Sequence, residues 1–232
     1  MKHARTIFLT LVVTTLISCS SSSDSETNPE ANFDSADYYY FISGKMNGES
    51  FLFGQRIDDT VLNYQLVFES PLEGATCAYS QDQGLDYKIS YLTSVYPDFD
   101  NEDSQPSMGI DFVRFYRCSD TQSSTEVFND LFGIGDYEYA SDNSESGTMK
   151  QIGITYSPIA TGDPYYESYG TIASSNSFKI TASEEYNDYI SGVLVAQNQL
   201  VEGEFTAKLY HADNSSDVIE ITEGRFKIIV TK

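Results

Sequence analysis

The chain is poor in residues that usually mark catalytic and metal sites. It has no tryptophan, three cysteines and two histidines among 232 residues, and 13 lysines and arginines stand against 35 aspartates and glutamates. The formal net charge of −22 repels phosphate backbones and anionic headgroups, which excludes nucleic-acid binding unless cations intervene. The scarcity of cysteine and histidine leaves no cluster from which a zinc site is built. We therefore expect no nucleic-acid partner, no metal and no cofactor.

Sequence motifs of common hydrolases are missing as well. There is no Gly-x-Ser-x-Gly and no His-Glu-x-x-His. Beyond the first 18 residues His211 is the single histidine, and Asp213 is too near in sequence to be an obvious triad partner. We expect His211 in an exposed loop and assign no catalytic residue. A glycoside hydrolase stays open as the alternative, because its two carboxylates cannot be chosen among 35 acids without geometry.

The sequence also lacks an apolar run long enough to form a membrane-spanning helix near its start. The run from Ile7 to Ile17 has eleven residues, whereas a spanning helix needs roughly 20. Lys2 and Arg5 precede it, which is typical of a signal peptide.

The run ends in Leu16-Ile17-Ser18-Cys19, which resembles a bacterial lipobox. The resemblance implies that residues 1–18 are a lipoprotein signal peptide and that Cys19 carries the lipid, such as palmitate. Each acyl chain adds about 0.8 kcal/mol of membrane affinity per buried methylene, so two or three chains anchor a protein firmly. The alternative is an ordinary cleaved signal in which Cys19 is incidental.

Cleavage before Cys19 leaves 232 − 18 = 214 residues with a net charge of (13 − 2) − 35 = −24. Residues 19–36 are rich in serine and acid and are expected to form a flexible linker. The tract is similar to those after the lipid-bearing cysteine of surface-exported Bacteroidota lipoproteins. We expect an outer-membrane lipoprotein, with the cell surface and a periplasm-facing position both open.

The other two cysteines are Cys77 and Cys118. In an oxidising envelope compartment they are expected to form a disulfide, worth roughly 4 kcal/mol on the chain-entropy model. The alternative is two buried free thiols.

Alternating apolar and polar residues predict an all-β domain over residues 37–232. Asn47-Gly48 between two apolar runs predicts a hairpin, and Ser124 to Phe132 predicts one short helix. We also expect a helical turn over Glu184–Tyr189 and a turn at Glu223-Gly224 between the last two strands. The prediction is one antiparallel β-sandwich of about ten strands, with a β-barrel as the alternative.

Three segments together resemble a family of Bacteroidota lipoproteins without assigned function. They are Phe128 to Tyr139, Gly153-Ile154-Thr155-Tyr156 with Tyr166-x-Ser168, and Val201 to Phe205 leading to Ile221 through Phe226. Their motifs are turn glycines and core aromatics, so the resemblance implies a shared fold and transfers no catalytic residue.

Two further patterns concern binding. The chain has eighteen tyrosines, and the cluster Tyr165, Tyr166 and Tyr169 suits stacking on a sugar or contact with a protein, although half-buried strand tyrosines would look the same. The acidic residues 98–103 suit calcium, or form a plain acidic loop. We expect an envelope-anchored, non-enzymatic binding or scaffolding module, with a surface carbohydrate-active hydrolase as the alternative. A purely structural surface component is a third option.

Overall fold

The computed structural model describes residues 33–69, 87–97, 105–116, 124–140, 150–159, 165–169 and 173–231. Cys19, Cys77 and Cys118 lie outside these residues. The signal peptide, nearly all of the expected linker and the acidic stretch 98–103 lie outside them as well. The expectations for these parts stay predictions.

Strands make up most of the described chain, with the short helix α2 (Ser124–Leu131) and a 3-10 turn, η2 (Ser35–Asp37). The strands are β1 (Tyr38–Met46), β2 (Glu49–Arg56), β3 (Tyr64–Glu69), β4 (Tyr87–Pro97), β5 (Ser107–Tyr116), β6 (Gly135–Tyr139), β7 (Lys150–Ser157), β8 (Tyr166–Glu167), β9 (Ser177–Glu185), β10 (Asp188–Ile190), β11 (Val193–Ala196), β12 (Asn198–His211) and β13 (Asn214–Thr231).

Five strands close into a ring. β12, β9, β6 and β7 are neighbours in the sheet, and β8 pairs with both β7 and β12. The β6–β7 pair is parallel and the other pairs of the ring are antiparallel. The all-β prediction is confirmed, and the closed ring corresponds to the β-barrel expected as the alternative to a sandwich.

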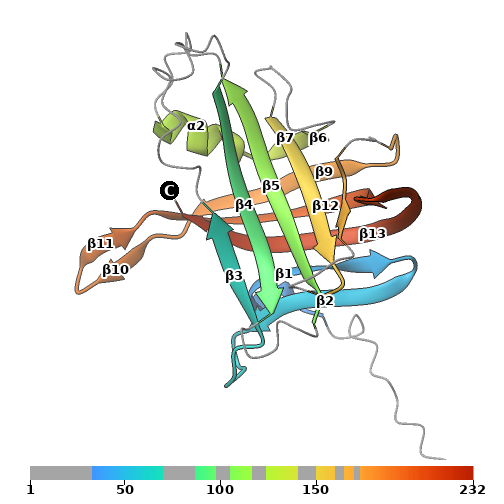
Figure 1. Ribbon diagram of the computed structural model, residues 1–232. Coiled ribbons are helices and arrows are strands. Elements are labelled where there is room, and N and C mark those ends of the chain that lie inside the picture. Colours follow the sequence, from blue (N-terminus) through green and yellow to red (C-terminus); the bar gives the residue numbers. More distant parts are fainter. Residues whose placement is uncertain are drawn as a thin grey trace, which may run out of the picture.

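Two arms extend the ring and fold over one another. β13, β1 and β2 continue from β12, whereas β5, β4 and β3 continue from β7. In Figure 1 the β3–β4–β5–β7 arm crosses in front of β12 and β13. Tyr40 Oη of one arm donates to the Tyr64 carbonyl of the other at 2.9 Å, and Phe53 of β2 stacks on Tyr156 of the ring strand β7 with ring centroids 6.3 Å apart. The arms thus share a core as the layers of a sandwich do.

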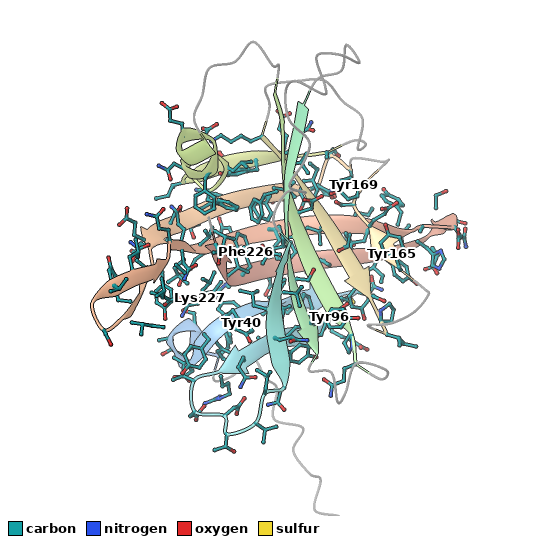
Figure 2. All side chains as sticks on the ribbon, turned by 60° about the vertical axis from the view of Figure 1, so that its left-hand side comes forward. Tyr40, Tyr96, Tyr165, Tyr169, Phe226 and Lys227 are labelled. Carbon is teal, nitrogen blue, oxygen red and sulfur yellow. The ribbon has the colours of Figure 1, made fainter. Side chains whose placement is uncertain are left out.

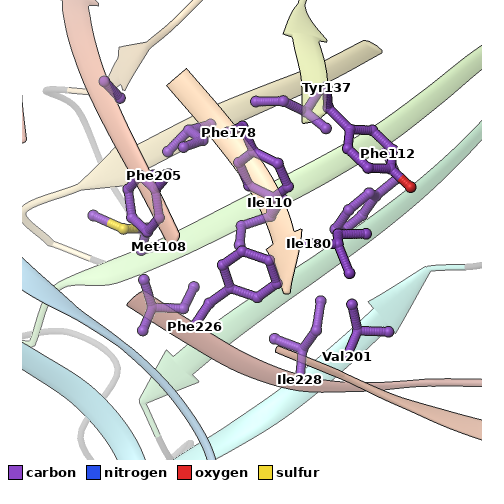
Figure 3. Close-up of a cluster of buried hydrophobic side chains, with 14 of the residues drawn as sticks. Met108, Ile110, Phe112, Tyr137, Phe178, Ile180, Val201, Phe205, Phe226 and Ile228 are labelled. Atoms are coloured by element: carbon purple, nitrogen blue, oxygen red, sulfur yellow. The ribbon is translucent and has the colours of Figure 1, made fainter. Parts of the chain in front are cut away.

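Phe178 lies at the centre of this core (Figure 3). Its ring stacks on Phe226 of β13 at 5.0 Å and meets Phe112 of β5 edge to face at 5.8 Å. All three side chains are at most 2% exposed. Because aromatic pairs in these geometries add stability beyond their buried area, this cluster ties both arms to the ring.

Two local predictions are confirmed. Asn47 and Gly48 have φ of 50° and 88° and join β1 to β2, as a two-residue hairpin turn requires. The helix α2 begins at Ser124 as expected, and it buries Phe128 and Leu131.

The turn expected at Glu223-Gly224 is wrong. β13 runs through it without interruption, and the hairpin with β12 turns at residues 212–213 instead. Glu223 has φ 54°, and between the pairs Phe205–Gly224 and Ala207–Ile221 two residues of β13, Thr222 and Glu223, face one residue of β12. The extra residue makes a β-bulge, which shifts the apolar alternation by one and so imitates a strand end in the sequence.

The helical turn expected over Glu184–Tyr189 is also wrong, because β9 continues to Glu185 and β10 starts at Asp188. The alternation from Val61 to Glu69 predicts a strand that starts at Val61, but β3 begins at Tyr64. The buried amide of Gln55 accounts for the later start, because its Oε1 accepts from the backbone N–H of Asn63 at 2.8 Å and takes the place of a strand partner.

Among the described residues, no helix combines the length and the apolar character that crossing a membrane requires.

Candidate functional site: a tyrosine-lined groove

The candidate site lies on the outer face of β4, β5, β7 and β8. Ser94, Gly109, Thr155 and Glu167 form one cross-strand row over these four strands. Successive side chains of a strand point to opposite faces. The residues that precede this row along each strand therefore point into the core, as Ile154 does before Thr155. The fold therefore presents this outer face as a fixed platform.

An open groove of about 370 Å³ lies on this platform. Tyrosines, small residues and two acids line it: Tyr96, Tyr156, Tyr165, Tyr169, Ser94, Ser107, Gly109, Thr155, Ser157, Asp111 and Glu167. Figure 2 shows the labelled Tyr96, Tyr165 and Tyr169 around the strands β4, β5 and β7, away from Lys227 on the other arm. Tyr156 follows Thr155 on β7 and its ring packs inward on Phe53, so the small residues of the floor leave the rings of Tyr96, Tyr165 and Tyr169 as the walls.

Tyr169 lies directly against the backbone of β7. A Cβ atom added to Gly153 would come within 2.1 Å of the Tyr169 Cζ and Oη atoms, so only glycine leaves room for the ring. Glycine in a strand interior weakens the strand, but it permits such a close approach. The ring then spans β7, and its hydroxyl donates to Asp111 Oδ2 on β5 at 2.8 Å.

The segment that carries Tyr165 and Tyr169 is fixed by Ser168. The Ser168 N–H donates to the Ile154 carbonyl at 2.9 Å, and its Oγ accepts from the Ile154 N–H at 2.8 Å. Ser168 is fully buried. Tyr166 also faces inward, where its hydroxyl donates to Asp217 Oδ2 at 3.1 Å. Alternation along this short segment therefore aims Tyr165, Glu167 and Tyr169 outward.

Each acid of the groove accepts a hydrogen bond from a tyrosine. Tyr165 Oη donates to Glu167 Oε2 at 2.5 Å, and Tyr169 donates to Asp111. Burial, helped by the neighbouring Glu167 carboxylate, raises the pKa of Tyr165 to about 12. Burial and the charge of Asp111 raise the pKa of Tyr169 well above its ordinary value. Both hydroxyls stay protonated as donors, and the oxygens of the two carboxylates stay acceptors.

The described lining contains no lysine, arginine or histidine. The groove is thus unsuited to an anionic ligand, because two carboxylates would repel it and no cation would offset them. Aromatic faces beside hydroxyl and carboxylate acceptors suit an uncharged ligand with many hydroxyl groups. The volume falls at the small end of ligand sites, which hold roughly 300–1,000 Å³.

A second hollow region surrounds Arg225 on the opposite arm, where three adjoining depressions of about 230, 390 and 510 Å³ share this residue. One row crosses four strands there as Arg225, Glu204, Lys179 and Asp136. Opposite charges placed across strands stabilise a sheet face on their own. We therefore assign this region a structural role and prefer the tyrosine groove, although one Arg225 depression is the better enclosed.

The structure brings together only part of the tyrosine cluster predicted from the sequence. Tyr165 and Tyr169 line the groove, whereas Tyr166 faces the interior. Tyr96 and Asp111 were missed. Val95 points into the core, so strand alternation points the next residue, Tyr96, outward. This alternation in the sequence could have identified Tyr96 as a surface residue. The proximity of Asp111 to Tyr169 had no such signal, because it arises from the pairing of β5 with β7.

His211 is not in an exposed loop. It is the last residue of β12 and is half-buried, with its ring 5.2 Å from that of Tyr166 in an edge-to-face contact. Its Nδ1 accepts from the Asp213 N–H at 3.1 Å. This position closes the β12–β13 turn and lies outside the groove lining.

Within the part of the chain that the structure describes, no group of three or more His, Cys, Asp or Glu side chains is placed to hold a metal ion. Comparison of the sequence with family models and with curated proteins finds no match, and comparison with solved structures finds none either.

Proposed function

We propose that the protein is an envelope-anchored lipoprotein that binds a neutral glycan in the tyrosine groove without transforming it. The lipobox resemblance at Cys19 supports the anchor, and the domain beyond the linker supplies the groove. An outer-membrane position, at the cell surface or facing the periplasm, follows from the same resemblance. The membership in a Bacteroidota lipoprotein family proposed from the sequence fits this reading.

One observation carries the binding proposal. The tyrosines stand on an outer sheet face whose floor is kept low by Gly109 and whose Gly153 makes room for Tyr169. Sugar rings have apolar faces that stack on aromatic rings and hydroxyls that donate to carboxylates. Asp111 and Glu167 offer such acceptors beside the rings.

A glycoside hydrolase is the second candidate, and the presence of two carboxylates in one groove favours it. Both carboxylates are engaged by tyrosine hydroxyls, and the groove is open. Incubation with the bound oligosaccharide distinguishes the two functions: release of reducing ends that Asp111→Asn and Glu167→Gln abolish would make the protein an enzyme.

The binding proposal is tested by titrating the purified protein with neutral oligosaccharides selected on a glycan array. Removing one stacking ring should cost about tenfold in affinity, so Tyr165→Ala is expected to weaken binding by that factor. Tyr39→Ala is the matched control, because Tyr39 is 47% exposed on β1, outside the groove lining. Equal affinities for the two variants, or no oligosaccharide bound, would refute a site at these tyrosines.

The anchor is tested independently by mass spectrometry of the native protein extracted from its membranes. An acylated Cys19 at the mature amino terminus is expected. An unmodified terminus at another position would remove the anchor and leave the groove proposal standing.

A further inference from the structure

The hairpin β10–β11 is the most apolar exposed part of the described chain. It projects from the body at the left of Figure 1. Five large side chains of the hairpin are exposed: Tyr189 (61%), Ile190 (66%), Val193 (65%), Leu194 (40%) and Val195 (52%). No charged residue occurs from position 189 to 197, although the chain has 48 charged residues in 232. Apolar clusters of this kind mark interaction sites.

The base of the hairpin is held firmly. Asn198 is 8% exposed and donates to Asp188 Oδ2 at 2.7 Å, while its Oδ1 accepts from Thr231 Oγ1 at 2.8 Å. The Tyr186 N–H donates to the Asn198 carbonyl at 2.9 Å. These bonds fix the hairpin to the ends of β12 and β13, so its tip is presented in one direction.

The apolar residues occupy both faces of the hairpin. Tyr189 is paired with Leu194, and Ile190 is paired with Val193. Cross-strand pairs share a face and successive pairs alternate between faces. A folded partner that covered one face would leave the other in water, whereas a lipid layer surrounds an inserted hairpin and covers both.

The large apolar side chains of the hairpin lie toward its tip, on either side of the Ser191-Gly192 turn, and its charged residues lie at the base. Ile190 and Val193 flank the turn at its tip, Tyr189 and Leu194 follow, and Asp188 and Glu185 lie at the base. Tyrosine rings suit the boundary between lipid and water, and aliphatic side chains suit the layer beneath it. The unpaired backbone groups of a two-stranded hairpin limit it to shallow insertion, because deeper hydrocarbon offers them no hydrogen bonds.

We propose that the β10–β11 tip inserts into the headgroup region of a bilayer and orients the body on the membrane that Cys19 is proposed to anchor. This inference draws on the anchor of the proposed function and is independent of the glycan site. Insertion of about 5–10 Å is typical of interfacial elements. With a net charge of −22 the protein favours zwitterionic lipid, since anionic headgroups repel it.

The absence of tryptophan allows a direct test. The full-length variant Ile190→Trp places a single tryptophan at the tip, and Val61→Trp places one at a site of matched exposure, 64%, between β2 and β3. Both are reconstituted with phosphatidylcholine vesicles and with vesicles that carry brominated acyl chains. We expect a blue shift and bromine quenching for Ile190→Trp and neither for Val61→Trp.

Both variants share the same amino terminus, so a lipid at Cys19 cannot produce the difference between them. Adding Val193→Asp to Ile190→Trp should abolish the shift, and anionic lipid should weaken it. If the Ile190→Trp protein floats with the vesicles but its tryptophan emission is unchanged, the proposal is overturned. Equal shifts in both variants would overturn it too, and so would a blue shift without vesicles that grows with protein concentration, since that would identify a second copy as the occupant.

Discussion

Gly153 and Tyr169 form the tightest residue-level requirement of the groove. A methyl group at Gly153 would overlap the Tyr169 ring, which also donates to Asp111. Gly153→Ala is expected to destabilise the fold by about 1–3 kcal/mol, as overpacking substitutions do. Urea unfolding measures this change.

The double variant Gly153→Ala with Tyr169→Ala provides the control. Removing the ring removes the overlap, so the double variant should lose less stability than the sum of the two single changes. Strict additivity would show that Tyr169 does not lie on Gly153.

The groove tyrosines also predict how stability depends on alkaline pH. The pKa of Tyr165 is raised to about 12 by burial and by Glu167, whereas an unfolded tyrosine titrates near about 10. The folded state therefore keeps a proton that the unfolded state loses. This contribution to stability is fully present below about pH 10 and is lost as the pH rises from about 10 to 12.

Urea midpoints measured from pH 8 to pH 12 check this expectation. The midpoint of the native protein should fall above about pH 10, and Tyr165→Phe should fall less steeply. The buried Tyr139, whose pKa burial also raises, leaves a remaining slope in the variant. Identical slopes would mean that Tyr165 titrates normally in the folded protein.

At the scale of elements, the bulge at Glu223 explains how β13 stays one strand. The inward residues Ile219 and Ile221 precede it and Phe226 and Ile228 follow it with the opposite parity. Deleting Glu223 removes the extra residue. The inward residues before and after it then follow one regular alternation, and none of them turns outward. Its exposed ion pair with Lys45, at 2.8 Å, contributes little.

Deleting Glu204 from β12 is the matched comparison, because it removes the same residue type from the neighbouring strand but breaks a regular alternation. Phe205, Ala207 and Leu209, or Val201 on the other side, would then turn outward. We expect the Glu204 deletion to abolish cooperative unfolding and the Glu223 deletion to keep it, as near-UV circular dichroism in urea reports. The bulge account fails if the two deletions are equally damaging.

The same elements show which features were predictable from the sequence. The hairpin at Asn47-Gly48 and the helix at Ser124 were predicted because turn and cap chemistry is local. The shift in alternation at Glu223 predicts a turn, since a β-bulge and a strand end leave the same one-residue shift in the sequence. Within the site, the outward tyrosines were partly predictable, but the contact of Tyr169 with Asp111 depends on long-range pairing that one sequence does not reveal.

At the scale of the whole molecule, Phe178 joins the ring to both arms. Phe178→Ala is expected to cost about 3–5 kcal/mol, because it empties the space between Phe226 and Phe112. Tyr189→Ala on the exposed hairpin should change stability by less than about 0.5 kcal/mol. Urea unfolding compares the two, and a similar small cost for both would mean that the arms do not share this core.

The separation of surfaces gives the molecule its proposed working arrangement. The groove lies across β4, β5, β7 and β8, the charged row around Arg225 crosses β13, β12, β9 and β6, and the apolar hairpin lies between β9 and β12 in the chain. A body oriented by the hairpin and held by an N-terminal lipid would keep one fixed face toward its ligand.

A crystal structure of the protein with the tightest-binding neutral oligosaccharide tests the central claim most directly. The account predicts a sugar ring seated between Tyr165 and Tyr169, with its hydroxyls on Asp111 and Glu167. An oligosaccharide bound at the Arg225 side, or one whose glycosidic bond is cut in the groove, would contradict it.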